Sequence, residues 1–226
     1  MIKIKKVADT LIISLITSVL ALSSYVVAEP QIIKAIEDQI TISQSVTAEI
    51  SVTSPSNVTM SPAIPGMTGS GGTPSTGSAT WTVITSNNTG FSMTLKSSSS
   101  PSMSGESQGG SFADYTPATP TVPDYNWAIA ATAAEFGYSV EPATAAVTAT
   151  IFLDNGSSAC NTGSSQTTGK CWLNASTTAV TIINRTSETS SGGEAEVVKF
   201  QVEQGASTFK IEDTYTATTT VTVTTN

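Results

Sequence analysis

Five residues between positions 114 and 127 have the side-chain types that could hold a sugar. Asp114 and Asp124 flank a Pro-rich stretch, and Tyr115, Tyr125 and Trp127 stand beside them. Carboxylates accept hydrogen bonds from hydroxyl groups, and aromatic rings offer large rigid apolar faces to a ligand. Ordinary loop positions and a core tryptophan would use the same residue types. We therefore treat these five residues as a candidate ligand patch.

The chain lacks the residues that the common catalytic and metal-binding arrangements need. The chain has no His, so Ser-His-Asp and Cys-His catalysis and His-ligated metal sites are excluded. Calcium could use the oxygens of Asp154 and Asn155 or of Glu212 and Asp213, but neither pair belongs to an Asp-x-Asp-x-Asp run. We expect a protein that is not an enzyme and has no metal or cofactor.

The two cysteines point to an oxidising compartment. Cys160 and Cys171 lie 11 residues apart across a stretch rich in Gly, Ser and Thr. Zinc sites use closer Cys spacing and usually His, whereas an even cysteine count in an exported chain favours a disulfide. We predict that Cys160 and Cys171 are disulfide-bonded.

The first 28 residues have the pattern of a secretory signal peptide. Lys3, Lys5 and Lys6 precede an apolar run from Leu11 to Leu22, and Val26-Val27-Ala28 offers a cleavage site. The alternative is an uncleaved anchor helix, for which the run is short. We expect residues 1–28 to be removed, leaving 29–226 as one secreted or cell-surface domain with no stable membrane span. The net charge of −8 argues against nucleic acid as a partner.

Alternating apolar residues predict an all-β fold. About a third of the chain is Ser or Thr, and the β-branch of Thr suits strands. At least eight segments alternate with a period of two, and no convincing helix separates them, which favours an antiparallel β-sandwich or a barrel. The alternating segments are 40–52, 81–83, 91–95, 136–140, 147–153, 180–182, 198–202 and 215–223.

The connections between these segments give three further expectations. Residues 86–90, Ser-Asn-Asn-Thr-Gly, predict a β-hairpin between the strands on either side. Residues 31–39 could form a short helix or an extended leader into the first strand. Residues 54–78 and 97–125 predict long Ser-, Gly- and Pro-rich loops, a kind that is often functional or mobile.

Two segments resemble a known group of bacterial surface proteins. They are Thr80–Leu95, in which a Thr-rich strand leads into an Asn- and Gly-containing turn, and the Thr-rich run Asp213–Thr224. Both are similar to the WxL-like cell-surface domains and related exported β-sandwiches. Trp81-Thr-Val83 and Trp127-Ala-Ile129 are the nearest counterparts of the defining Trp-x-Leu elements. The resemblance implies an envelope or extracellular Ig-like or WxL-like β-sandwich and no reaction.

Three functions remain open at this point. The chain could be a structural or adhesive surface protein, or a module that binds cell-envelope glycan through residues 97–127. It could also be a pilin-like fibre subunit that self-associates by exchanging strands, because residues 32–52 could complete a neighbouring copy. The alternative to strand exchange is that both terminal strands pair within one monomer.

Overall fold

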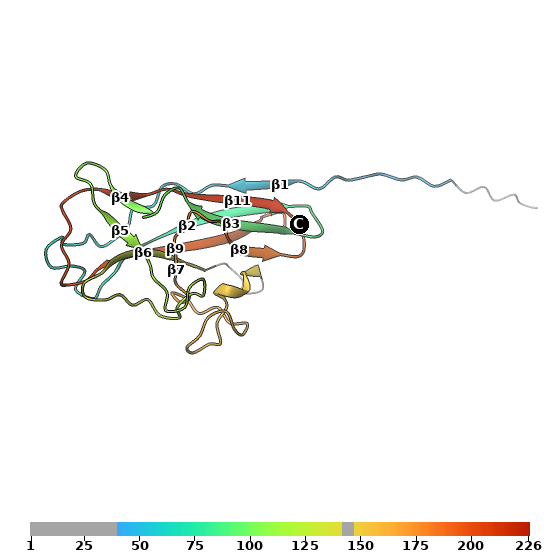
Figure 1. The fold of residues 1–226 in the computed structure, drawn as a ribbon. Helices are drawn as coiled ribbons and strands as arrows, with labels where there is room; N and C mark the ends of the chain where they lie inside the picture. Colours follow the sequence, from blue (N-terminus) through green and yellow to red (C-terminus); the bar gives the residue numbers. More distant parts are fainter. Residues whose placement is uncertain (1–39, 142–146) are drawn as a thin grey trace, which may run out of the picture. The chain divides into compact units, whose positions relative to one another are not determined.

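The computed structural model describes residues 40–141 and 147–226, and the regular secondary structure of this part of the chain is almost entirely β (Figure 1). Its named helical element is a single 3-10 turn, η2, at Thr150–Phe152. Within these residues no helix is long and apolar enough to cross a bilayer. Residues 46–226 form one compact unit and are described by themselves. The expected signal peptide at 1–28 and the candidate helix at 31–39 lie outside the described residues.

The larger of two sheets has eight strands in the order β1-β2-β9-β6-β5-β4-β10, with β7 paired to β6. Its pairs are antiparallel apart from β5 and β6, which run parallel. The strands are β1 (Ile50–Thr53), β2 (Ser75–Thr85), β4 (Met103–Gly105), β5 (Ser111–Asp114), β6 (Ala134–Val140), β7 (Leu173–Asn174), β9 (Glu194–Gln204) and β10 (Tyr215–Ala217).

The smaller sheet has three antiparallel strands in the order β11-β3-β8. They are β3 (Phe91–Ser97), β8 (Val180–Arg185) and β11 (Thr219–Thr225). The predicted final run of 215–223 is therefore split at Thr218 between the edges of two sheets, as β10 and β11.

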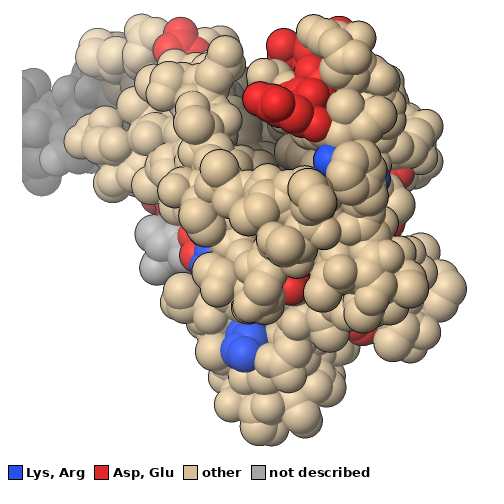
Figure 2. Space-filling model, turned by 90° about the vertical axis from the view of Figure 1, so that its left-hand side faces the viewer, with Lys and Arg blue, Asp and Glu red and all other residues tan. Residues whose placement is uncertain are grey.

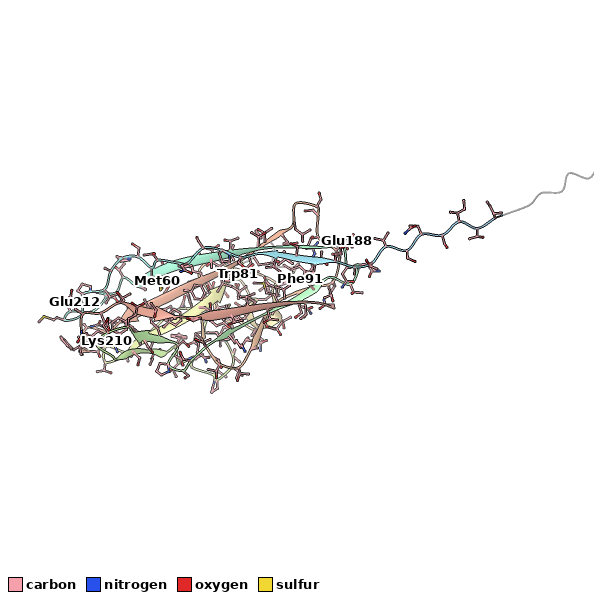
Figure 3. All side chains as sticks on the ribbon, turned by 90° about the horizontal axis from the view of Figure 1, so that it is seen from above. Met60, Trp81, Phe91, Glu188, Lys210 and Glu212 are labelled. Carbon is pink, nitrogen blue, oxygen red and sulfur yellow. A yellow bond between two sulfur atoms is a disulfide. The ribbon has the colours of Figure 1, made fainter. Side chains whose placement is uncertain are left out.

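One apolar cluster is shared by both sheets. Val83, Phe136 and Val198 contribute from the larger sheet, and Phe91 and Ile183 from the smaller one. Trp81 and Phe91, one from each sheet, lie in this packed region of side chains (Figure 3). The prediction of an all-β, largely antiparallel fold is confirmed.

The predicted hairpin across residues 86–90 is wrong in its pairing. Both strands and the turn form as expected, but β2 pairs with β1 and β9, whereas β3 pairs with β11 and β8. The turn carries the chain from one sheet to the other, and Trp81 before it and Phe91 after it both belong to the shared core. The buried side chain of Asn87 stabilises the turn by donating a hydrogen bond to the Gly90 carbonyl over 2.8 Å.

Two other strand predictions fail in part. Residues 147–153 make a single bridge, Thr148 to Ile183, and then turn into η2. Alternation in a short apolar run does not determine whether a strand partner is available. The long run of 40–52 forms a strand only from Ile50, where β1 meets β2. The expected loop at 97–125 contains two short strands, β4 and β5.

A carboxyl group is buried in the core among these strands. Glu196 of β9 lies opposite Trp81 of β2 and is 0% exposed. Neither of its carboxyl oxygens has a hydrogen-bond partner among the described residues. Burial raises the pKa of Glu196 to about 7, helped by the nearby charge of Glu194 and opposed by that of Arg185. Glu194 itself pairs with Arg185.

We expect the stability of the protein to fall as the pH rises from about 4.5 to about 7. In this window folded Glu196 keeps a proton that the unfolded chain, with an ordinary carboxyl pKa of 4.5, has already released. Replacing it in Glu196→Gln should reduce this slope and raise the free energy of unfolding at pH 8 by about 3 kcal/mol. Urea titrations at pH 4.5 and pH 8 measure it, with the exposed Glu188→Gln as control. Equal slopes in wild type and Glu196→Gln would contradict the assignment.

Candidate functional site

Tyr115 and Trp127 of the candidate patch lie on the outer face of β6 and β9, whereas Tyr125 packs against the shared core. Even-numbered residues of β6, such as Phe136 and Tyr138, belong to the core, so Glu135, Gly137 and Ser139 face outward. The irregular chain after β5 returns over this face. A Cβ atom placed on Gly137 would lie 2.9 Å from Tyr115 Cβ and 3.0 Å from Trp127 Cζ3. Trp127 therefore packs directly against the strand at its glycine.

Three aromatic rings form the centre of the site. Tyr115 stacks on Trp127 with ring centroids 4.3 Å apart and 18° between their planes. The edge of Trp172 meets Trp127 at 5.4 Å and 76°. Tyr115 and Trp172 are each 2% exposed, whereas Trp127 is half-buried. The three rings make a second apolar cluster outside the shared core.

Carboxylates fix the polar ends of these rings. The Tyr115 hydroxyl donates to Asp124 Oδ2 over 2.8 Å, and Trp127 Nε1 donates to Glu203 Oε2 over 2.6 Å. Asp124 also accepts from the Ala118 backbone N–H and shares a backbone bridge with Trp172. Burial, followed by the hydrogen bond to Asp124, raises the pKa of Tyr115. The phenol therefore stays protonated and acts as a hydrogen-bond donor.

Glu135 adds a second carboxyl group beside Glu203. The two residues are direct cross-strand partners on β6 and β9. Burial raises the pKa of Glu135, and the hydrogen bond that it accepts from the Thr116 N–H lowers it. Glu203 is held by Trp127 and Glu135 by the loop, so both carboxyl groups support the covering chain.

Tyr125 is placed differently from the stacked rings. The ammonium group of Lys170 lies 4.9 Å from its ring centroid and donates to Asn126 Oδ1 over 2.6 Å. Tyr125 keeps partial exposure, and Asn126 is exposed. These three side chains form the part of the patch that is open to solvent.

Asp114 does not join the site. It accepts hydrogen bonds from Ser100 Oγ at 2.7 Å and from the Ser102 N–H at 2.8 Å. Its side chain therefore holds the Ser-rich loop that follows β3. Of the five predicted patch residues, the structure brings Tyr115, Asp124 and Trp127 into direct contact and leaves Tyr125 beside them.

Sequence reasoning missed Trp172, Glu203 and Gly137. The alternation of β9 places Glu203 on its outer face, which was a usable signal. Trp172 follows a cysteine of the predicted disulfide and is therefore fixed in position. Nothing in the local sequence of Gly137 indicates that a ring packs against it.

The disulfide is present as predicted. Cys160 and Cys171 are joined, with Cα atoms 5.7 Å apart. The loop that they close is organised by Asp154, which is 0% exposed and accepts hydrogen bonds from the N–H groups of Gly156 and Thr167. The oxygens of Asp154 that could have served calcium are thus used by the protein itself. Among the described residues no cluster of three metal-ligating acidic or Cys side chains occurs.

Charge is sparse on the face shown in Figure 2, where most of the surface is neither acidic nor basic. A surface of this kind offers hydroxyl and amide groups in place of ion pairs, in keeping with a chain of which only 12% is charged.

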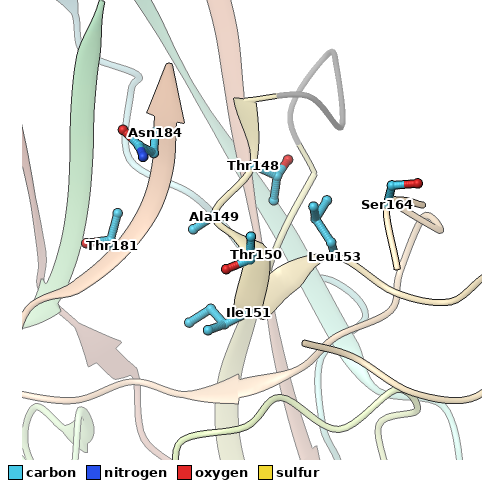
Figure 4. A pocket seen from close by; sticks show the side chains of 8 residues that line it. All are labelled: Thr148, Ala149, Thr150, Ile151, Leu153, Ser164, Thr181 and Asn184. Atoms are coloured by element: carbon cyan, nitrogen blue, oxygen red, sulfur yellow. The ribbon is translucent and has the colours of Figure 1, made fainter. Parts of the chain in front are cut away.

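A neutral hollow lies beside β8, with a volume of about 600 Å³ (Figure 4). Ala149, Ile151 and Leu153 supply apolar side chains to it. Hydroxyl and amide groups complete its lining, which contains no charged residue. The residues that line it are Thr148, Ala149, Thr150, Ile151, Leu153, Ser164, Thr181 and Asn184.

Comparison of the chain with models of known protein families, with curated proteins and with solved structures finds no significant match.

We expect Gly137→Ala to destabilise the protein by about 1–3 kcal/mol, the usual effect of overpacking. The new methyl group would lie 2.7 Å from the Leu173 carbonyl oxygen and would push Trp127 from the strand. Thermal unfolding and Trp fluorescence measure the two effects. Gly192→Ala is the matched control, because its nearest new contact is 3.8 Å away. Equal melting temperatures for the two variants would contradict the close packing of Trp127.

Proposed function

We propose that the chain is an exported, bacterial cell-surface protein with a structural or adhesive role and no catalytic activity, built on an Ig-like β-sandwich. The proposal rests on the hydrogen bonds that the acidic and phenolic side chains of the candidate patch and its neighbours make. Asp114, Tyr115, Asp124 and Glu203 are all engaged in hydrogen bonds that hold loops to the sheets. Such bonds stiffen a surface and leave no free acid-base pair at the aromatic cluster.

The disulfide supports the proposed location. Cys160 and Cys171 close a loop that lacks regular strands, and disulfides persist in oxidising compartments outside the cytoplasm. Cross-linking so short a loop stabilises the fold by about 2–3 kcal/mol in the chain-entropy model. A surface protein benefits from this because the compartment offers no repair of unfolded chains by cytoplasmic chaperones.

A glycan-binding role is the second candidate. Tyr125 and Trp127 are partly exposed, and Asn126 and Lys170 place an amide and an ammonium group beside Tyr125. Stacking on a ring and hydrogen bonding to amides are the contacts that sugars use. Other surface proteins could be bound by the same patch.

Surface location is tested by labelling intact cells that produce the full chain with a membrane-impermeant amine reagent. We expect the chain to be labelled, to start at Glu29 by mass spectrometry, and to show no free thiol before reduction. A chain that keeps residues 1–28, resists labelling and has two free thiols would overturn the proposed location. A cytoplasmic protein from the same cells is the labelling control.

Glycan binding is tested by passing the purified chain over an array of cell-envelope glycans. If the second candidate is right, Tyr125→Ala should weaken the strongest signal about tenfold, equivalent to about 1.4 kcal/mol. Phe209→Ala removes another aromatic ring, 64% exposed, and should bind as the wild type does. No signal on any glycan, or equal loss in both variants, would remove this candidate and leave the structural role.

A further inference from the structure

The segment just before β1 has the pattern of a strand without a partner. Ile40, Ile42 and Val46 share one parity with Ile50 and Val52, whose β2 partners are Thr85 and Val83. Val83 is a core residue, so this parity marks the apolar face of the strand. Yet Ile40, Ile42 and Val46 are 79, 87 and 88% exposed. Hydrophobic side chains exposed at regular intervals along one segment favour burial against another surface.

The segment is also free of charge. Residues 40–48 contain no Asp, Glu, Lys or Arg, in a chain whose net charge is −8. An uncharged extended segment can be buried without the desolvation cost that a charged side chain carries. Its complement should therefore be neutral, with an apolar base and polar groups for the backbone.

The hollow beside β8 has this chemistry. Ala149 and Ile151 supply apolar surface, and Thr181 and Asn184 on β8 supply a hydroxyl and an amide across from them (Figure 4). A volume of about 600 Å³ holds several aliphatic side chains. Thr181 and Asn184 are exposed, so the hollow can be entered from solvent.

The edge of β8 offers backbone groups as well. One edge of β8 pairs with β3. Among the described residues the other edge makes a single bridge, between Ile183 and Thr148. Next to this bridge the Ala149 N–H donates a hydrogen bond to the Ile182 carbonyl. Edge strands accept further strands through such groups. β1 contacts β11, at the opposite edge of the smaller sheet from β8. Because residues 40–48 directly precede β1, the segment of the same copy would have to cross this sheet to reach β8. The segment of a second copy does not meet this obstacle.

We propose that residues 40–48 of one copy lie as an extended strand in the hollow beside β8 of a second copy. This inference rests on the proposed structural role at the cell surface and names its partner. The two surfaces in contact differ, so the contact is head-to-tail and can repeat from copy to copy into a chain. Ile42 and Val46 enter the hollow, and the backbone of the segment bonds to the edge of β8.

The test uses light scattering after size-exclusion chromatography of the exported form, residues 29–226, over a range of concentrations. Val46→Asp disables the inserted segment, and Thr181→Glu disables the hollow at an exposed position that does not disturb the core. Both substitutions add negative charge, so no new salt bridge can rescue the contact. Met67→Asp is the matched control, because Met67 is an exposed apolar residue, 78% accessible, outside both surfaces.

We expect the wild type and Met67→Asp to form dimers and larger species as concentration rises. Val46→Asp and Thr181→Glu should each elute at the single-chain mass. Mixed in equal amounts, the two variants should form a species of twice that mass and nothing larger, because one intact segment meets one intact hollow.

Three results would overturn the proposal. A wild type that stays at the single-chain mass at all concentrations excludes the contact, while the cell-labelling result continues to decide the surface role independently. Assembly that survives Thr181→Glu shows that the segment binds elsewhere. Assembly that is lost equally in Met67→Asp shows that a different surface holds the copies together.

Discussion

The fold depends on one requirement, that the apolar residues of both sheets are buried together in one shared cluster. Each central strand is apolar on one side only, as in β3, where Phe91, Met93 and Leu95 are buried. Neither sheet could exclude water from its apolar face alone. The shared cluster therefore brings the two sheets together, and the loops connect strands that contribute to it.

This requirement explains where the sequence predicted the structure and where it did not. Alternation located β2, β3, β6, β8 and β9 because it reports one-sided burial. It did not assign strands to sheets, since Trp81 and Phe91 have the same local pattern whether they face each other or lie side by side. Pairing depends on contacts far along the chain, which a local window does not contain.

The candidate site shows the same division between local and distant information. Tyr115, Asp124 and Trp127 were visible as a cluster of types within one loop, and the structure joins them. Trp172 and Glu203 reach the same place from segments about 50 and 80 residues further along. Gly137 makes room for Trp127 because it has no side chain. A single glycine in a strand adds no apolar side chain to the alternating pattern, so the pattern does not indicate this contact.

The outer aromatic cluster changes the character of the larger sheet. An outward face of β6 and β9 would ordinarily carry polar residues in contact with water. Here Tyr115, Trp127 and Trp172 cover it, and Lys199 lies 5.8 Å above the Trp172 ring. The central strands are thus covered on both sides, which protects their hydrogen bonds from exchange with solvent.

The pairing of β2 with β9 also has a kinetic consequence. These strands span 75–85 and 194–204, and the neighbouring contact between Thr85 and Thr189 joins residues 104 positions apart. Asn87 in the turn after β2 donates a hydrogen bond to the Asn226 carbonyl, 139 positions away. Folds dominated by such distant contacts have high contact order and fold slowly. The centre of the larger sheet cannot assemble until β9 has been synthesised. The centre of this sheet therefore forms late, after most of the chain has been made.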